Sequence, residues 1–223
     1  MLINVIIQSR MSSKRFPGKV LSPFLEKPVF YHVVNQMKKI RNYNSIILVT
    51  STDKTDDPLA AYAKDLSLNV VRGPLDNVVE RFCLALDIHK CDAFFRVCGD
   101  SPLLPPHLFN HAISIYKKKN YDLITNIFPR SFPMGMSIEL FKTESFLSSV
   151  GKITDKIEKE HISKHFYNNY KKFKLYNFEC NLPTEPNLKL AIDNISDVKK
   201  IEEWHLQNNN QIEKLFGIKK SKN

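Results

Sequence analysis

The chain opens with a short apolar run followed by a basic loop. Residues 2–7 are almost all apolar and include β-branched side chains, a pattern typical of a strand buried on both faces of a sheet. Residues 8–19, which follow, are rich in amide, hydroxyl and cationic side chains. Ligands of open parallel sheets bind just beyond the carboxyl ends of the strands, where loop N–H groups add positive potential. This stretch therefore predicts a buried strand that leads into an anion-binding loop.

The loop obtains its positive charge from side chains rather than from exposed backbone. It contains neither GxGxxG nor GxxxxGK[ST], the glycine-rich motifs of dinucleotide and P-loop sites. Its cations are Arg10, Lys14, Arg15 and Lys19. Judged from composition alone, a solvated basic loop after an edge strand explains the pattern equally well.

Apolar runs alternate with helical patterns along the first half of the chain. Further strands are expected at 45–50, 68–71, 92–98 and 121–125. Helices are expected at 28–40, 57–66, 78–86 and 105–119, where apolar residues recur at helical spacing. Strands that alternate with helices in this way predict an α/β layered fold with a mostly parallel sheet.

The pattern is less regular after residue 125. Residues 131–141 alternate apolar and small side chains and predict a strand or hairpin, while 154–170 has the pattern of a charged amphipathic helix. Two more strands are expected at 174–179 and 189–193, and a final helix is expected to have Ser196 as its N-cap. No internal repeat or linker divides the chain, so we expect a single domain over 1–223 with an acceptor or dimerisation excursion at about 127–185.

The net charge of +10 is compatible with an anionic partner, such as a nucleotide, an acidic or phosphorylated sugar, a nucleic acid or a membrane, although general solvation explains most of it. The lysines are dispersed over the expected helix surfaces, which argues against a nucleic-acid-binding stripe. The first apolar run is too short for a signal peptide, and no run is long enough to cross a membrane. These observations favour a cytoplasmic protein that binds a small anionic molecule and neither nucleic acid nor membrane.

The cysteines and the closely spaced histidines do not suggest a metal or redox site. His107 and His111 lie four residues apart on an expected helix, but no glutamate accompanies them as in HExxH, so we expect them to pack against the protein. The cysteines form no CxxC pair and lie in apolar stretches, a setting typical of reduced core cysteines: Cys83, Cys91, Cys98 and Cys180.

Asp100 and Asp193 are the candidates for metal ligands. Each follows an expected buried strand, 94–98 or 188–192, so both carboxylates should reach the rim where the basic loop lies. Mg²⁺ prefers one or two carboxylates together with phosphate oxygens and water. Taken singly, Asp100 also fits a turn residue and Asp193 a helix cap. As a pair beside a cationic loop they favour a site for Mg²⁺ and phosphate.

Four segments resemble motifs of one enzyme family. Residues 8–21, Gln-Ser-Arg-Met-Ser-Ser-Lys-Arg-Phe-Pro-Gly-Lys-Val-Leu, are similar to Q-A-R-M-S-S-x-R-x-P-G-K-x-L, the opening motif of the spore coat polysaccharide (SpsF) type of cytidylyltransferase, which is related to the CMP-sialate and CMP-Kdo synthetases. Residues 72–82 resemble R-G-x-x-x-D-V-L-x-R-Y, 96–106 resemble R-x-x-G-D-x-P-L, and 190–197 resemble V-D-T-x-E-D. The resemblance implies a three-layer α/β/α, Rossmann-like nucleotidyltransferase fold of the GT-A-like class, with a mostly parallel mixed sheet.

The resemblance also implies a reaction and its residues. An anionic acceptor attacks the α-phosphate of CTP and pyrophosphate leaves, so the protein mainly positions the reactants and neutralises charge. Arg10, Lys19 and Arg15 are implied to be catalytic, Asp100 and Asp193 to hold the cofactor Mg²⁺, and the apolar segment 127–146 to form a homodimer. The residues implied to bind the nucleotide are Gln8, Ser9, Arg10, Met11, Ser12, Ser13, Lys14, Lys19, Thr50, Ser51, Arg72, Gly73, Asp76, Arg96 and Gly99.

The acceptor side departs from the family pattern. Where relatives typically carry F-P-D-G-x-D-V-E, residues 132–139 read Phe-Pro-Met-Gly-Met-Ser-Ile-Glu, so that Met134 and Ser137 replace two aspartates. A pocket that lacks two carboxylates suits a more negatively charged acceptor, such as a phosphate or phosphonate; neutral drift in a hairpin is the alternative. Glu160-His161 resembles the R-E-H segment of the family. The residues expected at the acceptor are Met134, Gly135, Ser137, Glu139, Glu160 and His161.

Two other functions stay open at this point. Nucleotide-sugar glycosyltransferases have a related core, but they usually carry an Asp-x-Asp metal motif, and Asp100-Ser-Pro lacks the second aspartate. A non-catalytic basic nucleotide- or nucleic-acid-binding protein is disfavoured because Arg10, Lys19 and both aspartates are intact. The leading hypothesis is a Mg²⁺-dependent cytidylyltransferase that transfers CMP to an acidic sugar or to a phosphate- or phosphonate-bearing acceptor for surface glycan synthesis.

Overall fold

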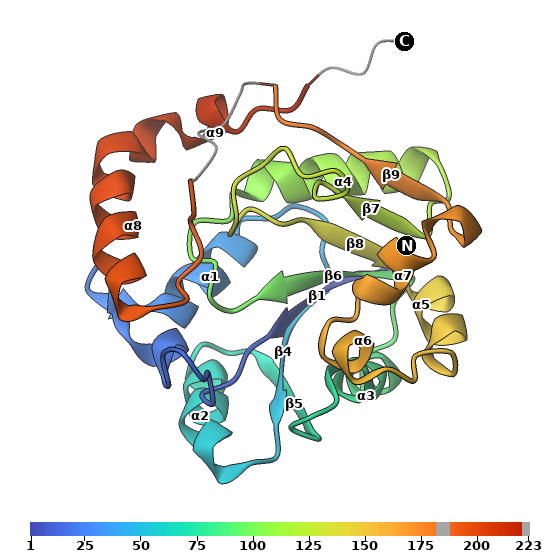
Figure 1. Cartoon of the computed structure of the whole chain (residues 1–223), viewed down its shortest axis with the longest axis horizontal. Coiled ribbons are helices and arrows are strands. Elements are labelled where there is room, and N and C mark those ends of the chain that lie inside the picture. Colours follow the sequence, from blue (N-terminus) through green and yellow to red (C-terminus); the bar gives the residue numbers. More distant parts are fainter. Residues whose placement is uncertain (182–187, 220–223) are drawn as a thin grey trace.

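A sheet of seven strands lies at the centre of the protein, whose computed structural model describes residues 1–181 and 188–219 (Figure 1). The strand order is β5-β4-β1-β6-β8-β7-β9. Helices pack against both faces of the sheet, so the molecule has three layers (Figure 1). The α/β/α arrangement around a mostly parallel mixed sheet, which the sequence predicts, is confirmed.

Four neighbouring strands are parallel and contain the apolar runs of the first half of the chain: β1 (Ile3–Gln8), β4 (Ser45–Ser51), β5 (Asn69–Gly73) and β6 (Ala93–Cys98). β1 lies between β4 and β6, where Ile6 is opposite Ile47 on one side and Arg96 on the other. Because the four strands run in the same direction, their carboxyl ends share one rim of the sheet. The loops that leave this rim are the ones that can build a ligand site.

The other three strands make the sheet mixed: β7 (Leu123–Thr125), β8 (Glu139–Lys142) and β9 (Leu175–Asn177). β8 is antiparallel to both β6 and β7, while β7 and β9 are parallel. Since β8 runs opposite to β6, its first residue lies beside the last residues of β6. Glu139 is thereby brought to the rim at which the parallel strands end.

Two apolar clusters fill the space between the sheet and its helices. Val5, Ile7 and Phe95 contribute to one cluster, and Ile6 and Phe94 to the other, because successive residues of a strand point to opposite faces. The helices over the first cluster are α1 (Val29–Met37), α2 (Asp57–Asp65), α4 (Pro106–Lys118) and α8 (Ile195–Asn208). The helices over the second cluster are α3 (Val78–Ile88), α5 (Thr143–Val150) and α7 (Lys164–Asn168).

Several short elements were not expected from the sequence. They are the antiparallel pair β2 (Pro23–Phe24) and β3 (Lys27–Pro28), the helices α5 and α9 (Ile212–Leu215), and the 3₁₀ turns η1 (Lys19–Leu21), η2 (Lys54–Asp56), η3 (Tyr170–Lys172) and η4 (Asn209–Gln211). Pro28 ends β3 and is the N-cap of α1, one position before the helix that it was expected to open. Apart from α5, which has eight residues, these elements have two to four residues and therefore too few positions to show a period.

The single helix expected over 154–170 is wrong. α6 (Lys156–Glu160) ends before His161, whose φ of −118° and ψ of 82° lie outside the helical region, and α7 begins at Lys164. Ile162, between them, is fully buried in the core. Glu158 accepts hydrogen bonds from His165 and Asn168 (2.9 Å each), which join the two short helices. Tertiary contacts therefore outweigh helix continuity, as they commonly do in short charged helices.

Three expectations near the rim also need correction. Residues 131–138 form a loop, and only the last part of the strand or hairpin expected over 131–141 is a strand, β8. The strand expected over 189–193 is reduced to one bridge, between Lys189 and Met134. The final helix is capped by Asn194, in a capping box with Asp197, rather than by Ser196.

The histidines and cysteines that were expected to pack do so. The His107 ring nitrogen Nε2 lies 2.9 Å from the carbonyl oxygen of Phe216, and His111 packs edge-on against Phe178. Cys83, Cys91 and Cys98 are half-buried. Among the described residues, no helix is both long and apolar enough to cross a bilayer. The excursion expected at about 127–185 extends over 182–185, which lie outside the described residues.

Candidate active site

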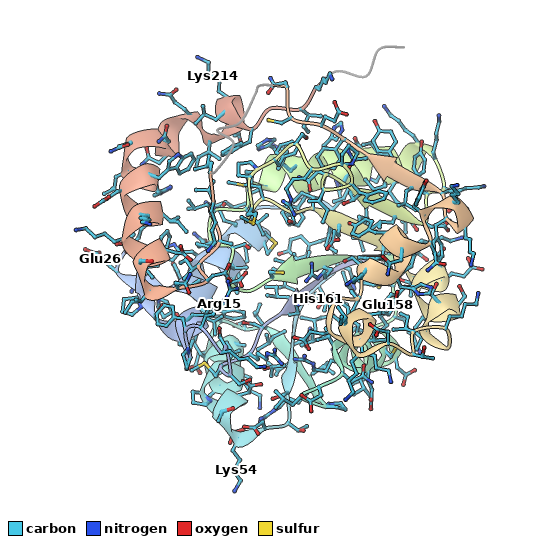
Figure 2. The ribbon with its side chains drawn as sticks, viewed as in Figure 1. Arg15, Glu26, Lys54, Glu158, His161 and Lys214 are labelled. Carbon is cyan, nitrogen blue, oxygen red and sulfur yellow. The ribbon has the colours of Figure 1, made fainter. Side chains whose placement is uncertain are left out.

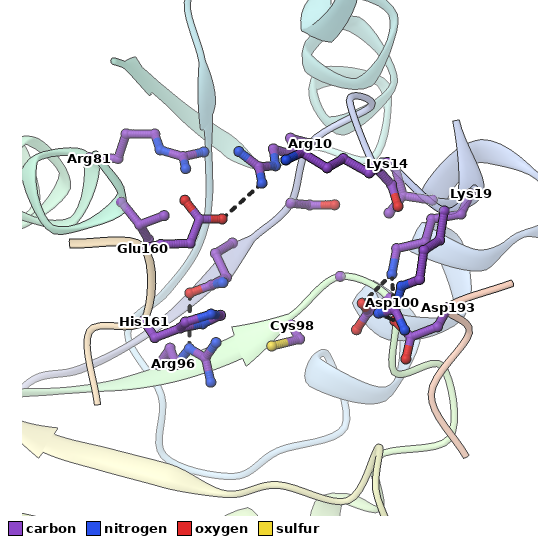
Figure 3. A pocket seen from close by; sticks show the side chains of 17 residues that line it. Arg10, Lys14, Lys19, Arg81, Arg96, Cys98, Asp100, Glu160, His161 and Asp193 are labelled. Atoms are coloured by element: carbon purple, nitrogen blue, oxygen red, sulfur yellow. Dashed lines mark hydrogen bonds and ion pairs between the residues drawn. The ribbon is translucent and has the colours of Figure 1, made fainter. Parts of the chain in front are cut away.

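A pocket of about 380 Å³ lies at the carboxyl rim of the parallel strands, where the basic loop meets α3, the end of β6 and the break between α6 and α7 (Figure 3). Arg15 and His161, which both line it, lie toward the middle of the molecule, whereas Glu26, Lys54 and Lys214 project from its periphery (Figure 2). The residues that were predicted for the nucleotide, for catalysis or for the metal and that line this pocket are Gln8, Ser9, Arg10, Ser13, Lys14, Arg15, Lys19, Arg96, Gly99, Asp100 and Asp193.

The basic loop folds around one carbonyl group. The Met11 carbonyl oxygen accepts hydrogen bonds from the N–H groups of Ser13 (2.9 Å) and Gly18 (2.8 Å). Gly18 has a φ of 74°, a left-handed conformation that glycine adopts without strain, and it is the N-cap of η1. The turn thus places Lys19 at the start of η1 with its side chain pointing inward and only 11% exposed.

Asp56 holds the basic loop in place through the backbone of Met11. Its buried carboxylate accepts hydrogen bonds from the Met11 N–H (2.7 Å), from the Thr50 hydroxyl (3.0 Å) and from both the N–H (3.0 Å) and the hydroxyl of Ser51. A buried carboxylate is tolerated when its oxygens are satisfied in this way. Thr50 and Ser51 were predicted to line the nucleotide pocket. They are instead fully buried and direct their hydroxyls to Asp56, so their role is to support the loop.

Five other residues of the predicted nucleotide set line neither this pocket nor the cavity beside it: Met11, Ser12, Arg72, Gly73 and Asp76. Arg72 donates hydrogen bonds to the carbonyl oxygens of Ser51 (2.7 Å) and Asp53 (2.8 Å) and pairs with Asp57 (2.7 Å). Its guanidinium therefore fastens the end of β4 to η2 and α2.

Lys19 joins the two predicted metal ligands. Its ammonium Nζ donates to Asp100 Oδ2 (2.6 Å), to Asp193 Oδ1 (3.3 Å) and to the carbonyl oxygen of Ile192 (2.9 Å). Figure 3 shows the two carboxylates on either side of the lysine tip. Residues that are 93 positions apart in the chain therefore converge on one cation, and their role as metal ligands stays a prediction.

Asp193 reaches this point without being at the end of a strand. The backbone N–H of Ile192 donates to the Asp100 carbonyl oxygen (2.9 Å), and that of Leu190 donates to the Met134 carbonyl oxygen (2.7 Å). The Asp193 carboxylate also pairs with Arg15 (2.8 Å) and Lys189 (3.1 Å). Burial works to raise the pKa of Asp193, but Lys189 and Lys19 outweigh it, and the pKa lies below its usual value. The carboxylate is therefore ionised at neutral pH.

The donor set fits a divalent cation that also binds substrate. Within the described parts of the chain, no three His, Cys, Asp or Glu side chains are grouped closely enough to hold a metal by themselves. Asp100 and Asp193 supply two carboxylates that already share one cation, the Lys19 ammonium. Mg²⁺ characteristically takes one or two carboxylates and completes its six oxygens with phosphate and water. The site therefore suits Mg²⁺ bound together with a phosphate-bearing ligand.

Arg10 and Glu160 face each other across the other end of the pocket. They form an ion pair of 2.8 Å between Arg10 Nη2 and Glu160 Oε1, and His161 lines the pocket beside them (Figure 3). The break after α6 is what turns Glu160 and His161 toward the pocket. These two residues were expected at the acceptor together with Met134. They lie with the basic loop instead, in the larger pocket.

Arg81 is a pocket residue that sequence reasoning missed. It is 2% exposed, makes no ion pair among the described residues, and its Nε has no hydrogen-bond partner. Its guanidinium points toward Arg10 and Glu160 (Figure 3), and burial lowers its pKa. A buried, unpaired charge is unfavourable by itself, which indicates a ligand-binding role. The available signal was the family motif over residues 72–82, because Arg81 occupies the second arginine of R-G-x-x-x-D-V-L-x-R-Y although it was not assigned to the site.

A second cavity of about 220 Å³ adjoins the first, and Arg96, Cys98, Asp100 and Asp193 line both. Three of the residues predicted for the acceptor line the second cavity: Met134, Gly135 and Ser137. Gly135 has a φ of 95°, and a Cβ there would collide with the backbone of Leu190 and Ala191. Arg130 also lines this cavity and was missed, although it is the only cation between residues 127 and 138.

A buried network supports the wall between the two cavities. Arg96 pairs with Glu139 (2.8 Å) and donates to Gln8 Oε1 (2.9 Å), and Glu139, which is 1% exposed, accepts a hydrogen bond from the Tyr167 hydroxyl (2.6 Å). Burial and the negative charge of Glu139 raise the pKa of Tyr167, so its hydroxyl is a donor at neutral pH. Burial also raises the pKa of Cys98 to about 11, which keeps its thiol protonated and a poor nucleophile.

Comparison with known proteins agrees with this geometry. Residues 4–216 match a family described as cytidylyltransferase. The spore coat polysaccharide biosynthesis protein SpsF of Bacillus subtilis is 26% identical over 208 residues, which cover 88% of this chain and 83% of SpsF. A cytidylyltransferase from Leptospira borgpetersenii has the same fold over the whole of both chains, with a TM-score of 0.86 and 23% identity. CMP:2-keto-3-deoxy-manno-octonic acid synthetase, solved with CTP, has a TM-score of 0.72 at 12% identity over 93% of this chain and 100% of its own.

These findings confirm the resemblance that the four motifs carried. The family match includes the basic loop, Asp100 and Asp193, which the fold brings to one rim. Because that match extends over nearly the whole chain, the protein belongs to the cytidylyltransferase family and is a CTP-dependent nucleotidyltransferase.

Proposed function

We propose that the enzyme transfers CMP from CTP to an acidic sugar or to an acceptor that bears a phosphate or phosphonate, with Mg²⁺ as cofactor and release of pyrophosphate. The observation that carries the proposal is the convergence of Asp100 and Asp193 on the Lys19 ammonium, at the rim that both cavities share. The relative SpsF is a spore coat polysaccharide biosynthesis protein, which supports a role in making a surface glycan.

The larger pocket suits the nucleotide because its cations are arranged along its length. Lys14 and Lys19 lie at one end, and Arg10 and Arg81 at the other (Figure 3), while Arg15 pairs with Asp193 beside Lys19. Nucleotidyl transfer develops negative charge on the phosphoryl oxygens and on the departing pyrophosphate, and fixed cations stabilise both. Lys19 and Arg15 are assigned this role because they already contact the carboxylates beside which the α-phosphate would lie.

Asp100 and Asp193 would hold Mg²⁺ together with phosphate oxygens, and the bound ion would polarise the α-phosphate. The acceptor would enter through the smaller cavity, so that its attacking oxygen lies beside the same carboxylates. The protein residues then act by holding the two substrates in line and by balancing their charge, which is how much of the barrier to such transfers is removed.

The first test is ligand-induced stabilisation by CTP, UTP, ATP and GTP, each with and without Mg²⁺. A ligand that binds only the folded state raises the melting temperature according to how far its concentration exceeds Kd. We expect the largest rise with CTP plus Mg²⁺, and we expect Asp100→Ala to weaken it. A preference for UTP would contradict cytidylyl transfer, and a lack of response to every nucleotide would contradict the proposed function as a whole.

We also propose that the enzyme forms a homodimer through the segment 127–146. Phe128 and Met134 in this segment are 37% and 54% exposed, so two large apolar side chains are available to a partner. Light scattering should give a mass near 52 kDa, twice the 25.9 kDa of one chain. A mass of one chain at micromolar concentration would contradict the dimer and leave the proposed chemistry intact.

A further inference from the structure

The charged groups that line the smaller cavity are nearly all paired within the protein. Arg96 pairs with Glu139 (2.8 Å). Asp100 pairs with Lys19 (2.6 Å), and Asp193 pairs with Arg15, Lys19 and Lys189. These pairs make the wall of the cavity close to neutral, apart from one residue.

Arg130 is the exception. Among residues 1–181 and 188–219, no carboxylate lies within ion-pair distance of its guanidinium. Its Nη1 donates to the Pro133 carbonyl oxygen (3.3 Å), and its Nη2 donates to the Ser137 hydroxyl (3.1 Å). Both acceptors are neutral, and an arginine stays protonated in any protein environment. The cavity therefore has one full positive charge that forms no ion pair with a described residue, although Glu139 lies near enough to stabilise it in part.

The loop that holds Arg130 is fixed in place. Asn126 is fully buried, and its side-chain amide donates to the Met136 carbonyl oxygen (2.8 Å) while its Oδ1 accepts from the Ile138 N–H (2.8 Å). These two bonds hold the backbone on either side of Ser137. Ser137 in turn holds one nitrogen of Arg130, so the guanidinium is oriented before any ligand arrives.

We propose that Arg130 binds the anionic group of the acceptor and that Ser137 keeps it available by orienting it without neutralising it. The proposal rests on the proposed function, because it takes the smaller cavity to be the acceptor site. A guanidinium presents a planar set of donors that matches the oxygens of a phosphate, a phosphonate or a carboxylate. The acceptor is thus expected to bear such an oxyanion and to have a small apolar part facing Leu104, Met134 and Ala191.

The test compares two substitutions of similar size at Ser137. In Ser137→Asp a carboxylate pairs with Arg130 and occupies it, whereas in Ser137→Asn the side chain has nearly the same shape but no charge. Each protein is saturated with α,β-methylene-CTP and Mg²⁺, so that the larger pocket is filled and no transfer occurs. Methylphosphonate is then titrated and followed by ³¹P NMR. Acetate is tested by its ability to displace the phosphonate.

We expect Ser137→Asp to weaken methylphosphonate binding at least about tenfold, since a charge-assisted hydrogen-bonded pair contributes about that much. Ser137→Asn should stay within about twofold of the wild type, and Arg130→Gln, at an exposed position, should lose most of the binding. Stronger displacement by acetate would identify a carboxylate-bearing acceptor, and weak displacement would identify a phosphate- or phosphonate-bearing one.

Three outcomes would overturn the proposal: equal effects of Ser137→Asp and Ser137→Asn, wild-type affinity in Arg130→Gln, or no binding of either anion by the nucleotide-loaded wild type. Failure of the CTP analogue to bind would instead contradict the proposed function. In that case the same titration without nucleotide still tests Arg130, because the two Ser137 variants leave the basic loop unchanged.

Discussion

The two loops that meet at the rim handle charge in opposite ways. In the basic loop, residues 8–19, three cations are paired with carboxylates. Arg10 pairs with Glu160, Arg15 with Asp193, and Lys19 with Asp100 and Asp193. In the loop 127–138, the one cation, Arg130, contacts only neutral acceptors. Three of the four cations of the basic loop are therefore paired with carboxylates before any ligand binds, whereas the one cation of the loop 127–138 has no carboxylate partner among the described residues.

This difference implies different events on binding. A triphosphate that enters the larger pocket exchanges existing ion pairs for new ones, so Lys19 becomes available to phosphate as its carboxylates bind another cation. An acceptor that enters the smaller cavity forms a pair where none existed. The nucleotide side should therefore be sensitive to loss of carboxylates as well as of cations, whereas the acceptor side should be sensitive to added carboxylates.

The largest expected effect comes from removing a shared carboxylate. Asp100→Asn should lower kcat/KM for pyrophosphate release by at least about 10²-fold, because several kcal/mol of charge stabilisation by a bound cation is lost. Asp87→Asn is the matched control: this carboxylate is exposed on α3 and pairs only with Lys90, so activity should stay within about twofold. If Asp100→Asn kept a tenth of the activity, the carboxylates that contact Lys19 would not be part of the catalytic site.

The support of the basic loop gives the second effect. Asp56→Ala leaves the Met11 N–H and the donors of Thr50 and Ser51 without their acceptor, so the free energy of unfolding should fall by about 3 kcal/mol. CTP-induced stabilisation should shrink as well, because the loop loses its anchor. Asp53→Ala removes an exposed carboxylate that accepts hydrogen bonds from the N–H and the hydroxyl of Thr55, so it should change thermal unfolding much less. Equal losses would contradict the role of Asp56.

Arg81 allows stability and binding to be separated. Arg81→Met removes an unpaired buried charge and keeps most of the volume, so the ligand-free protein should gain about 1–3 kcal/mol of stability. At the same time the affinity for CTP should fall. Arg72→Met serves as the control. Arg72 is paired with Asp57, so the same change there should lower the stability of the protein. Thermal melts with and without CTP measure both quantities; loss of stability in Arg81→Met would show that its charge serves the fold.

The smallest effect tests the wall between the cavities. Tyr167→Phe removes the hydroxyl that donates to Glu139 and keeps the ring that stacks on Phe128. The KM for the acceptor that supports pyrophosphate release should rise by about tenfold, the value of one charge-assisted hydrogen bond. The KM for CTP should not change. Tyr170→Phe, at an exposed ring, should alter neither constant, and a rise in the KM for CTP would place the network on the nucleotide side.

The local sequence pattern predicted an element correctly where the burial of that element follows from its own residues. The apolar runs that became β1, β4 and β6 are buried on both faces, so their hydrophobicity alone predicted them and the rim at which they end. The same pattern failed for 154–170 and 189–193. There the backbone follows Ile162 into the core and Leu190 onto the Met134 carbonyl, contacts made with residues distant in the chain.

The sequence by itself determined the fold class, the parallel strands and the position of Asp100 at their carboxyl rim, because strand burial follows from local hydrophobicity. The meeting of Asp193 with Asp100 depends on contacts of Leu190 and Ile192 with distant residues. Only the tertiary structure decided which side chains pair with one another and which line a pocket. It assigned Thr50 and Ser51 to Asp56, turned Glu160 and His161 into the larger pocket, and left Arg81 and Arg130 without carboxylate partners among the described residues. The physical reason is that charge pairing depends on distances of a few ångströms between segments whose relative placement is set by packing.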